Sequence, residues 1–584
     1  MSSNHQENLN DLRHSCAHLL AAAVMELYPS TKRTIGPSIE NGFYYDFDFG
    51  EVKISEEDLS KIEERMISIL PTWKNFEKID VSLNQARDEY KDNPYKLELI
   101  EEILTKGEGL TFYKSGGYVD LCRGGHSKNP SEDLRHFKLL KTAGAYWRGN
   151  EKNKMLTRIY GTCFPTKEEL DKYLWQLTEA EKRDHRKLGI QLDLFHFQPE
   201  APGIPFWHPK GYTIRNELIN FSRQVQSRYG YKEVQTPIML DVEIFKTSGH
   251  WDHYHNDMFF TEYEEGKTLG LKPMNCPGMI QIYKSSPKSY RDLPLYLSEY
   301  GVITRKEKSG ELNGMFRVMQ ATQDDAHLFV TPEGISEALE GLISLVSDIY
   351  KVFGIEYKAF LSTRPDDFMG SIDVWNSAET TLKKAMENAG LEVLIREKDG
   401  AFYGPKIDYR LSDCLGRTWQ CATLQLDFQM PETFSLEYTG VGGRMLRPVM
   451  IHRTIIGSFE RFMGIITEHY AGAFPVWLSP IQAKIIPISD KFLAYAQTVE
   501  SALAEKNIRV EIDDRSETMS AKIRDAQLNK IPYMIIVGQK EIDRQAVSVR
   551  LRDGRDLGST EINELINKMG SVISKRSLDL VPLS

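Results

Sequence analysis

Histidine and cysteine pairs with metal-binding or catalytic potential stand in the first quarter of the chain. His14 and His18 lie four residues apart in an Ala- and Leu-rich segment, so a helix there would place both imidazoles on one face. Cys122 and His126, in YVDLCRGGH, add two side chains that can bind a metal or assist hydrolysis. The residues alone leave three interpretations open: a structural zinc site, ordinary helix and loop histidines, or a hydrolytic site.

A second group of residues has the chemistry to hold phosphates. Arg305 and Glu307 precede a turn that contains glycine and serine, and Arg317 follows it. Two guanidinium groups across a hairpin can clamp a triphosphate, and a carboxylate can accept from an adenine amine. By charge spacing alone, a solvated hairpin with surface ion pairs is the simpler interpretation. Because no Walker-type loop and no dinucleotide-binding glycine fingerprint occurs, a nucleotide site would need other chemistry.

Several domains must position these groups, since 584 residues are too many for one hydrophobic core. We expect a first domain over residues 1–165, with a helix at 12–27 and a strand at 43–49. A charged, largely solvated connecting helix within 166–190 should follow, opened by a capping box at Thr166.

The remaining chain divides into two further expected domains. Over residues 191–478, the segments LEVLIRE, KIDYRLSD and TWQCATLQLDFQM predict neighbouring strands of an antiparallel sheet. Over residues 479–584, AKIIPIS, IRVEID and YMIIVG alternate with helical stretches at 491–506 and 519–530. That alternation predicts a small α/β domain with a mostly parallel sheet.

Composition places the chain among globular proteins without a membrane segment. Hydrophobic residues make up 41% and charged residues 27%, and no run of about 18 apolar residues or signal peptide occurs. Six cysteines in so long a chain do not form a disulfide framework, so a reducing, cytoplasmic location is expected. The net charge of −10 argues only weakly against nucleic acid, because an acidic protein can present basic patches.

Longer motifs stand between residues 183 and 462: RDHRKLGIQLDLFHF (183–197), LKPMNCPGM (271–279), TQDDAHLF (322–329), FYGPKID (402–408), WQCATLQLDF (419–428) and MIHRTIIGSFERF (450–462). The last of these, through GSFERF, resembles the class II aminoacyl-tRNA synthetases. The whole set, found in family order, narrows the resemblance to the threonyl-tRNA synthetase family. It implies an α+β multidomain protein with an antiparallel class II catalytic domain, an N-terminal editing domain and a C-terminal anticodon-binding domain.

The resemblance implies a catalytic site for L-threonine, ATP and tRNA(Thr). One zinc ion per chain is expected on Cys276, His327 and His452, with an open position that would favour threonine over valine. ATP with Mg²⁺ is expected beside it. The residues that the family match assigns to ATP and the reaction are Arg305, Glu307, Arg317, Gln323, Lys406, Gln420, Ser458 and Arg461.

The same resemblance favours the hydrolytic interpretation of the N-terminal site. It implies hydrolysis of mischarged seryl-tRNA(Thr) without metal, because serine keeps the hydroxyl that zinc requires and lacks only a methyl. The residues matched to this editing site are His14, His18, Lys96, Asp120, Cys122 and His126.

Some features depart from the family pattern or leave alternatives open. Only 13 residues precede His14, so we expect the small ubiquitin-like domain found in many members to be absent. Glu541 and Arg550 match anticodon contacts, whereas Ser516 stands where asparagine is expected. A homodimer is implied by the segment YGYKEVQTPIM alone. The alternatives are a class II synthetase for serine or proline and a non-catalytic RNA-binding relative.

Overall fold

The computed structural model describes residues 3–581, with side chains from Glu7 onward. The chain forms two compact units, Met1–Thr178 and Glu179–Ser584. Within the described residues, every helix is too short or too polar to cross a lipid bilayer.

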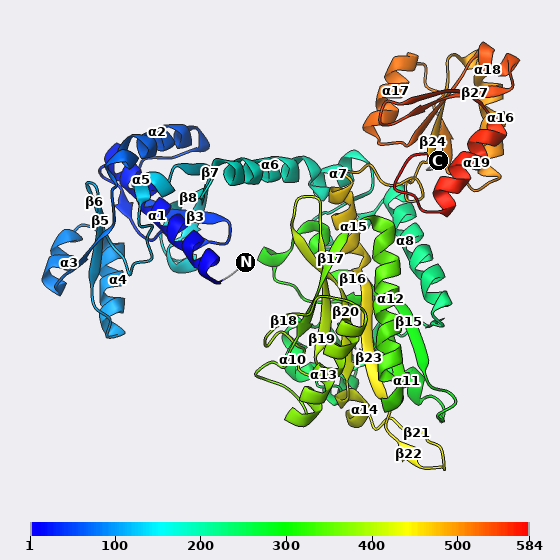
Figure 1. Cartoon of the computed structure of the whole chain (residues 1–584), viewed down its shortest axis with the longest axis horizontal. Helices are drawn as coiled ribbons and strands as arrows, with labels where there is room; N and C mark the ends of the chain where they lie inside the picture. Colours follow the sequence, from blue (N-terminus) through cyan, green and yellow to red (C-terminus); the bar gives the residue numbers. More distant parts are fainter. Residues whose placement is uncertain (1–2, 582–584) are drawn as a thin grey trace. The chain divides into compact units, whose positions relative to one another are not determined.

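The first unit contains two small antiparallel sheets and their helices (Figure 1). Its larger sheet has the order β1-β3-β8-β7, with β2 paired to β3. The strands are β1 (Lys32–Arg33), β2 (Ser38–Ile39), β3 (Gly42–Asp48), β7 (His136–Tyr146) and β8 (Met155–Phe164). The smaller sheet, β4-β5-β6, and the helices are β4 (Glu77–Asp80), β5 (Thr111–Ser115), β6 (Tyr118–Leu121), α1 (Ser3–Leu27), α2 (Leu59–Ile69), α3 (Leu83–Glu89), α4 (Pro94–Thr105) and α5 (Pro130–Asp133).

Helix α1 packs its apolar residues against β3, β8 and α2. Leu19, Leu20 and Ala23 are fully buried there, which explains the Ala-rich sequence, because small residues allow close approach to the sheet. The helix ends at Leu27 and β3 covers residues 42–48, so both elements expected from the sequence are confirmed.

The connector expected after residue 165 is a helix that ends earlier than its charge pattern suggested. Helix α6 (Lys167–Arg183) begins after Thr166, whose hydroxyl accepts from the amide of Glu169 (3.2 Å), and buries only Leu170. A new helix, α7 (His185–Gln191), starts at once, because the Asp184 carboxylate accepts from the amide of Arg186 (2.8 Å) and caps it.

The second unit is built on an eight-stranded sheet with the order β11-β15-β16-β23-β20-β19-β17-β18. The strands are β11 (Lys232–Glu233), β15 (Leu295–Thr304), β16 (Gln320–Val330), β17 (Glu356–Ser362), β18 (Leu394–Arg396), β19 (Lys406–Ser412), β20 (Thr418–Asp427) and β23 (Val449–Ser458). β19 and β20 are antiparallel neighbours, as expected. LEVLIRE contains a strand of this sheet, β18, as predicted, but its expected antiparallel pairing is wrong, because β18 pairs parallel to β17 at the sheet edge.

Three long helices bury their apolar residues with this sheet: α8 (Pro209–Arg228), α12 (Ile335–Phe353) and α15 (Phe459–His469). On α12 the buried residues Leu342, Val346 and Ile349 recur at helical spacing and face the core. The helix ends at Gly354, whose φ of +62° suits a left-handed cap. The remaining helices of this part are α9 (Val242–Thr247), α10 (His250–Tyr254), α11 (Cys276–Lys284), α13 (Ile372–Asn388) and α14 (Gln429–Thr433).

Short strand pairs complete the central part and include β9 (Phe195–His196) with β10 (Phe206–Trp207), β12 (Met239–Asp241) with β14 (Lys267–Leu271) and β13 (Phe260–Glu264), and β21 (Tyr438–Thr439) with β22 (Met445–Leu446).

The C-terminal region has its own five-stranded sheet, β25-β24-β26-β27-β28. Its elements are β24 (Ala483–Pro487), α16 (Leu493–Ala504), β25 (Val510–Ile512), α17 (Met519–Leu528), β26 (Tyr533–Val537), α18 (Gln539–Asp543), β27 (Ala546–Leu551), β28 (Asp556–Glu561) and α19 (Ile562–Ser574). The three predicted strands are parallel, and β27 and β28 add an antiparallel pair, so the sheet is mixed rather than mostly parallel.

Candidate functional site

Strand pairing brings together three metal-capable residues that are far apart in the sequence. His327 on β16 lies directly opposite His452 on β23, and Cys276 is the first residue of α11. Their ligand atoms lie within 4.8 Å of one another, and all three residues are buried. They line a cavity of about 240 Å³, the cysteine–histidine cavity, together with Asp325 and Tyr403.

The environment of these residues fits a metal ligand set. Burial, with the nearby charge of Asp325, raises the pKa of the Cys276 thiol well above its usual range. Burial lowers the pKa of His327, whose Nδ1 is buried without a hydrogen-bond partner. His452 Nε2 lies 2.8 Å from the carboxylate of Asp427, the kind of partner that orients a metal-bound imidazole. One cysteine and two neutral histidines suit zinc and leave further positions for substrate.

An arginine cavity of about 320 Å³ adjoins this site. Its lining includes most of the residues predicted to bind ATP: Arg305, Glu307, Arg317, Gln323, Gln420, Ser458 and Arg461. Arg317 reaches Glu307 (2.7 Å) and Glu311 (2.5 Å), so the two predicted nucleotide-binding side chains face each other across the hairpin. Lys406 does not line this cavity; it lines the cysteine–histidine cavity and pairs with Asp408 (2.9 Å).

The two cavities share four lining residues, Arg305, Gln323, Thr423 and Thr454. A ligand that fills one cavity therefore contacts residues that also line the other cavity.

Asp325 is a residue of this site that was not predicted. Burial raises the pKa of its carboxyl to about 6, and the Asn275 side-chain amide donates to it (3.0 Å). A signal was present, because Asp325 stands two residues before His327 and so shares its face of the strand.

The start of α15 places Arg461 at the arginine cavity. The Ser458 hydroxyl caps the helix by accepting from the Arg461 amide (3.0 Å). The Arg461 guanidinium donates to the carbonyl of Phe316 (2.9 Å), which belongs to the turn Gly314–Phe316. One contact therefore fixes the Arg461 backbone and the other fixes its guanidinium.

The four N-terminal His and Cys residues form one cluster beside a cavity of about 580 Å³, the N-terminal cavity. His14 Nε2 lies 3.0 Å from Cys122 Sγ, which is 3.3 Å from His126 Nε2. The His126 ring stacks on Phe76, with 4.0 Å between centroids. Burial lowers the pKa of His126 to about 3 and raises the pKa of Cys122 to about 11, so both are neutral at pH 7.

Asp120 stands at the base of this cavity in a buried network of charges. Its carboxylate accepts from Lys96 (2.7 Å), Arg33 (3.2 Å) and the Tyr45 hydroxyl (2.7 Å). Burial alone would raise the pKa of Asp120, but the charges of Lys96 and Arg33 outweigh it and lower the pKa. Asp120 is also 3.7 Å from His18, so the predicted residues are brought together. Arg33 and Tyr45 were missed, because no sequence pattern shows which residues of β1 and β3 reach Asp120 on β6.

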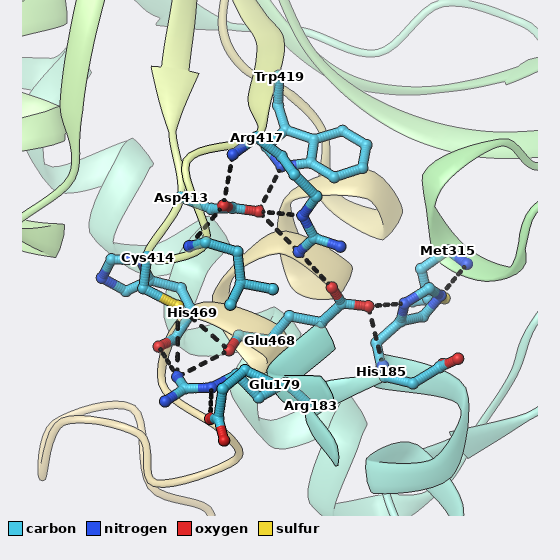
Figure 2. A network of polar contacts seen from close by, with 12 residues as sticks. Glu179, Arg183, His185, Met315, Asp413, Cys414, Arg417, Trp419, Glu468 and His469 are labelled. Atoms are coloured by element: carbon cyan, nitrogen blue, oxygen red, sulfur yellow. Dashed lines mark hydrogen bonds and ion pairs between the residues drawn. The ribbon is translucent and has the colours of Figure 1, made fainter. Parts of the chain in front are cut away.

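A third set of possible ligands, Asp184, His185 and Glu468, is already saturated by hydrogen bonds. His185 Nδ1 contacts Glu468 (2.7 Å), and its Nε2 accepts from the Met315 amide (2.9 Å) (Figure 2). The Glu468 carboxylate also forms an ion pair with Arg417 (2.5 Å). With both imidazole nitrogens engaged, this set is a hydrogen-bond network rather than a metal site.

The residues predicted to contact an anticodon lie on the C-terminal sheet and its helix. Arg550 on β27 is exposed and 3.5 Å from Asp556, while Glu541 is on α18. Arg515, next to Ser516, is held by Asp513 (2.6 Å) and Asp525 (2.7 Å).

Three protein families match successive parts of the chain. Residues 110–160 match the threonyl and alanyl tRNA synthetase second additional domain. Residues 259–470 match the tRNA synthetase class II core domain (G, H, P, S and T), and residues 482–571 match the anticodon binding domain.

Full-length relatives are similar over nearly the whole chain. Threonine–tRNA ligase from Caldanaerobacter subterraneus subsp. tengcongensis is 52% identical over 97% of this chain and 87% of its own length. The enzyme of the same name from Clostridium tetani is 51% identical over 98% of this chain and 90% of its own. A structure described as the RNA binding domain of threonyl-tRNA synthetase from Cryptosporidium parvum has a TM-score of 0.66 and 42% identity, covering 68% of this chain and all of that one.

The protonation state of Cys122 leads to a test by alkylation. With a pKa of about 11, only about one thiol in a thousand is ionised at pH 8. We therefore expect Cys122 to react slowly with iodoacetamide at pH 8, in the presence of a chelator, and about tenfold faster for each unit of pH up to 10. Peptide mass spectrometry measures the rate, and the exposed Cys414 serves as the internal control for access. Fast alkylation at pH 7 that does not rise with pH would show a thiolate instead.

Proposed function

The chain belongs to the threonine–tRNA ligase family, and from that premise we propose that it joins L-threonine to tRNA(Thr) through threonyl adenylate, with zinc selecting threonine and a separate site removing serine. The observation that carries the proposal is the shared wall of the two central cavities. It would place an amino acid held beside Cys276, His327 and His452 next to a triphosphate held by arginines.

Adenylate formation follows from that arrangement. A threonine carboxylate oxygen attacks the α-phosphorus of ATP, and the bond from that phosphorus to pyrophosphate breaks. The carboxylate is ionised at pH 7, so no general base is needed. Arg305, which lines both cavities, is placed to neutralise the carboxylate and the α-phosphate together. Arg317 and Arg461 would hold the outer phosphates and the adenine face, Glu307 would accept from the adenine amine, and Mg²⁺ would accompany the triphosphate.

The second step transfers threonine to tRNA. A hydroxyl of the terminal ribose attacks the carbonyl carbon of the adenylate, and the bond to AMP breaks. Gln323, Gln420 and Ser458 line the arginine cavity and would position the adenylate for this attack. Lys406, which lines the cysteine–histidine cavity, would interact with the carbonyl group of the bound threonyl adenylate.

Zinc would be held by Cys276, His327 and His452, with Asp427 orienting His452. When bound, it would supply coordination sites for the amino and hydroxyl groups of threonine. Valine has no hydroxyl to offer, whereas an apolar pocket alone separates such isosteres only about 10²-fold. Asp325, beside these residues, is placed to accept from the substrate amine.

Serine discrimination requires the second site. Serine carries the hydroxyl and differs from threonine by one methyl, worth about 1–3 kcal/mol. We assign hydrolysis of seryl-tRNA(Thr) to the N-terminal cavity. Neutral His14 and His18 would orient a water towards the ester carbonyl, whose bond to the ribose breaks to release serine. Cys122 and His126 would contact the ribose or the substrate amine. Lys96 and Asp120, which form an ion pair, would supply the charged groups at the base of the cavity.

Contacts within the N-terminal cluster support a site without metal. His14 Nδ1 is engaged by the carbonyl of Gly36 (3.2 Å), and His14 Nε2 lies 3.0 Å from Cys122 Sγ. Both imidazole nitrogens of His14 therefore have partners within the protein.

The zinc assignment predicts the metal content of a variant. Protein purified without added metal should contain one zinc per chain, and Cys276→Ser should lose it, because the soft thiolate ligand is removed. Elemental analysis measures the ratio. Cys421→Ala, a buried cysteine of the arginine cavity, should keep its zinc. Full zinc content in Cys276→Ser would refute the assignment.

Arg461 provides a test of the triphosphate clamp. Arg461→Ala should reduce threonine-dependent ATP–pyrophosphate exchange by at least about 10²-fold, the scale for removal of a preorganised charge donor. The exposed Arg291, whose guanidinium donates to the Tyr290 hydroxyl (3.1 Å), gives a control variant, Arg291→Ala, with unchanged exchange. Near-normal exchange in Arg461→Ala would show that the arginine cavity has another ligand.

The editing assignment predicts a change in accuracy rather than in threonine charging. His14→Ala combined with His18→Ala should charge threonine normally while seryl-tRNA(Thr) accumulates, because water is no longer oriented at the ester. His136→Ala, in the same unit, is the control. Hydrolysis of purified seryl-tRNA(Thr) by the whole chain should persist in chelator; loss on chelation and recovery with zinc would establish a metal site instead.

A further inference from the structure

A buried histidine outside both central cavities holds one wall of the arginine cavity in place. His185 is the first residue of α7 and is 1% exposed. Its Nε2 accepts from the backbone amide of Met315 (2.9 Å), so its Nδ1 must carry the proton that is donated to Glu468 (2.7 Å) (Figure 2). The ring therefore joins the turn Gly314–Phe316 to helix α15.

Glu468 fixes the orientation of that histidine. Its Oε1 accepts from both the backbone amide (3.1 Å) and the Nδ1 of His185, and its Oε2 accepts from Arg417 (2.5 Å). Arg417 is held in turn by Asp413 (2.7 Å), which also accepts from the indole of Trp419 (2.9 Å). Because each member of this chain of contacts has a partner, His185 has one tautomer and one ring position.

The turn that His185 holds contributes directly to the arginine cavity. Phe316 lines that cavity, and its carbonyl accepts from the Arg461 guanidinium (2.9 Å). Its ring centroid lies 4.3 Å from that of His185 and 4.1 Å from that of Trp419. His185 and Glu468 do not line either central cavity.

Gly314 shows how closely the turn approaches His185. Its φ is +50°, and a Cβ at this position would lie 2.3 Å from His185 Nε2. The turn therefore rests on the imidazole with no space for a larger residue, and a shift of the ring would displace Met315 and Phe316.

We infer that His185 and Glu468 are positioning residues of the nucleotide site: they set the turn Gly314–Phe316 and, through the Phe316 carbonyl, the position of Arg461. This inference rests on the proposed assignment of ATP to the arginine cavity. Neither residue touches substrate. Their effect should therefore fall on ATP and spare threonine, whose proposed site is in the other cavity.

The test compares two substitutions of His185. His185→Phe keeps an aromatic ring against Phe316 but removes both polar contacts, whereas His185→Gln keeps an acceptor for the Met315 amide. For His185→Phe, the loss of a buried hydrogen bond predicts a rise in KM for ATP of about fivefold or more, with unchanged KM for threonine, in pyrophosphate exchange. His185→Gln should recover most of that loss. Lys187→Ala, on the exposed side of α7, is the matched control.

Amide hydrogen exchange gives a second readout that does not depend on activity. The Met315 amide should exchange faster in His185→Phe than in the unchanged protein, and at a near-normal rate in His185→Gln. Thermal unfolding identifies a variant that fails to fold. If His185→Phe is such a variant, the KM values and the Met315 exchange rate are measured on His185→Gln.

The outcomes separate this inference from the assignment on which it rests. If Arg461→Ala abolishes exchange but His185→Phe, correctly folded, leaves KM for ATP unchanged, the positioning role is wrong. A parallel rise in KM for threonine and ATP would also overturn it, because it would indicate general loosening. If Arg461→Ala itself leaves exchange intact, the proposed ATP site is wrong.

Discussion

The central site depends on the pairing register of β16 with β23. His327 stands opposite His452, and Gln323 stands opposite Ser458. A slip of one residue would turn His327 and its neighbours to the other face of the sheet. Between these pairs the register shifts, and Gly457, with φ +78°, lies inside the irregularity. The strand ends one residue later at Ser458, which caps α15. One sheet irregularity therefore separates the metal-capable residues from those proposed to bind phosphate.

The sequence predicted the elements and most of the residues that gather in each cavity, but it could not predict their distances. Helix α1 follows from apolar periodicity, and its spacing places His14 and His18 on one face. The set of Cys276, His327 and His452 could be found only by resemblance, because no local pattern connects residues joined by sheet register. The short edge strand β18 was the weakest prediction: it is parallel to β17 because helix α13 connects the two, and a helical crossover returns the chain in the same direction.

The N-terminal cavity uses a different physical device from the central one. Asp120 is buried with two cations, Lys96 and Arg33, and with tyrosine hydroxyls. Burying one carboxylate with so many partners offsets the cost of removing it from water and keeps it ionised. The histidines above it are neutral for the opposite reason, because burial disfavours their charged forms. The cavity therefore holds an ionised carboxylate beside a neutral imidazole, with Asp120 and His18 3.7 Å apart.

The shared wall of the two central cavities also bears on inhibition. A molecule that covalently joins an amino-acid-like group to a nucleotide-like group would occupy both cavities at once, because Arg305, Gln323, Thr423 and Thr454 border both. Once one half is bound, the other is held at a high effective concentration, so the joined molecule loses translational freedom only once. Its affinity should approach the product of the two separate affinities, and a rigid linker of matching length would retain more of that advantage than a flexible one.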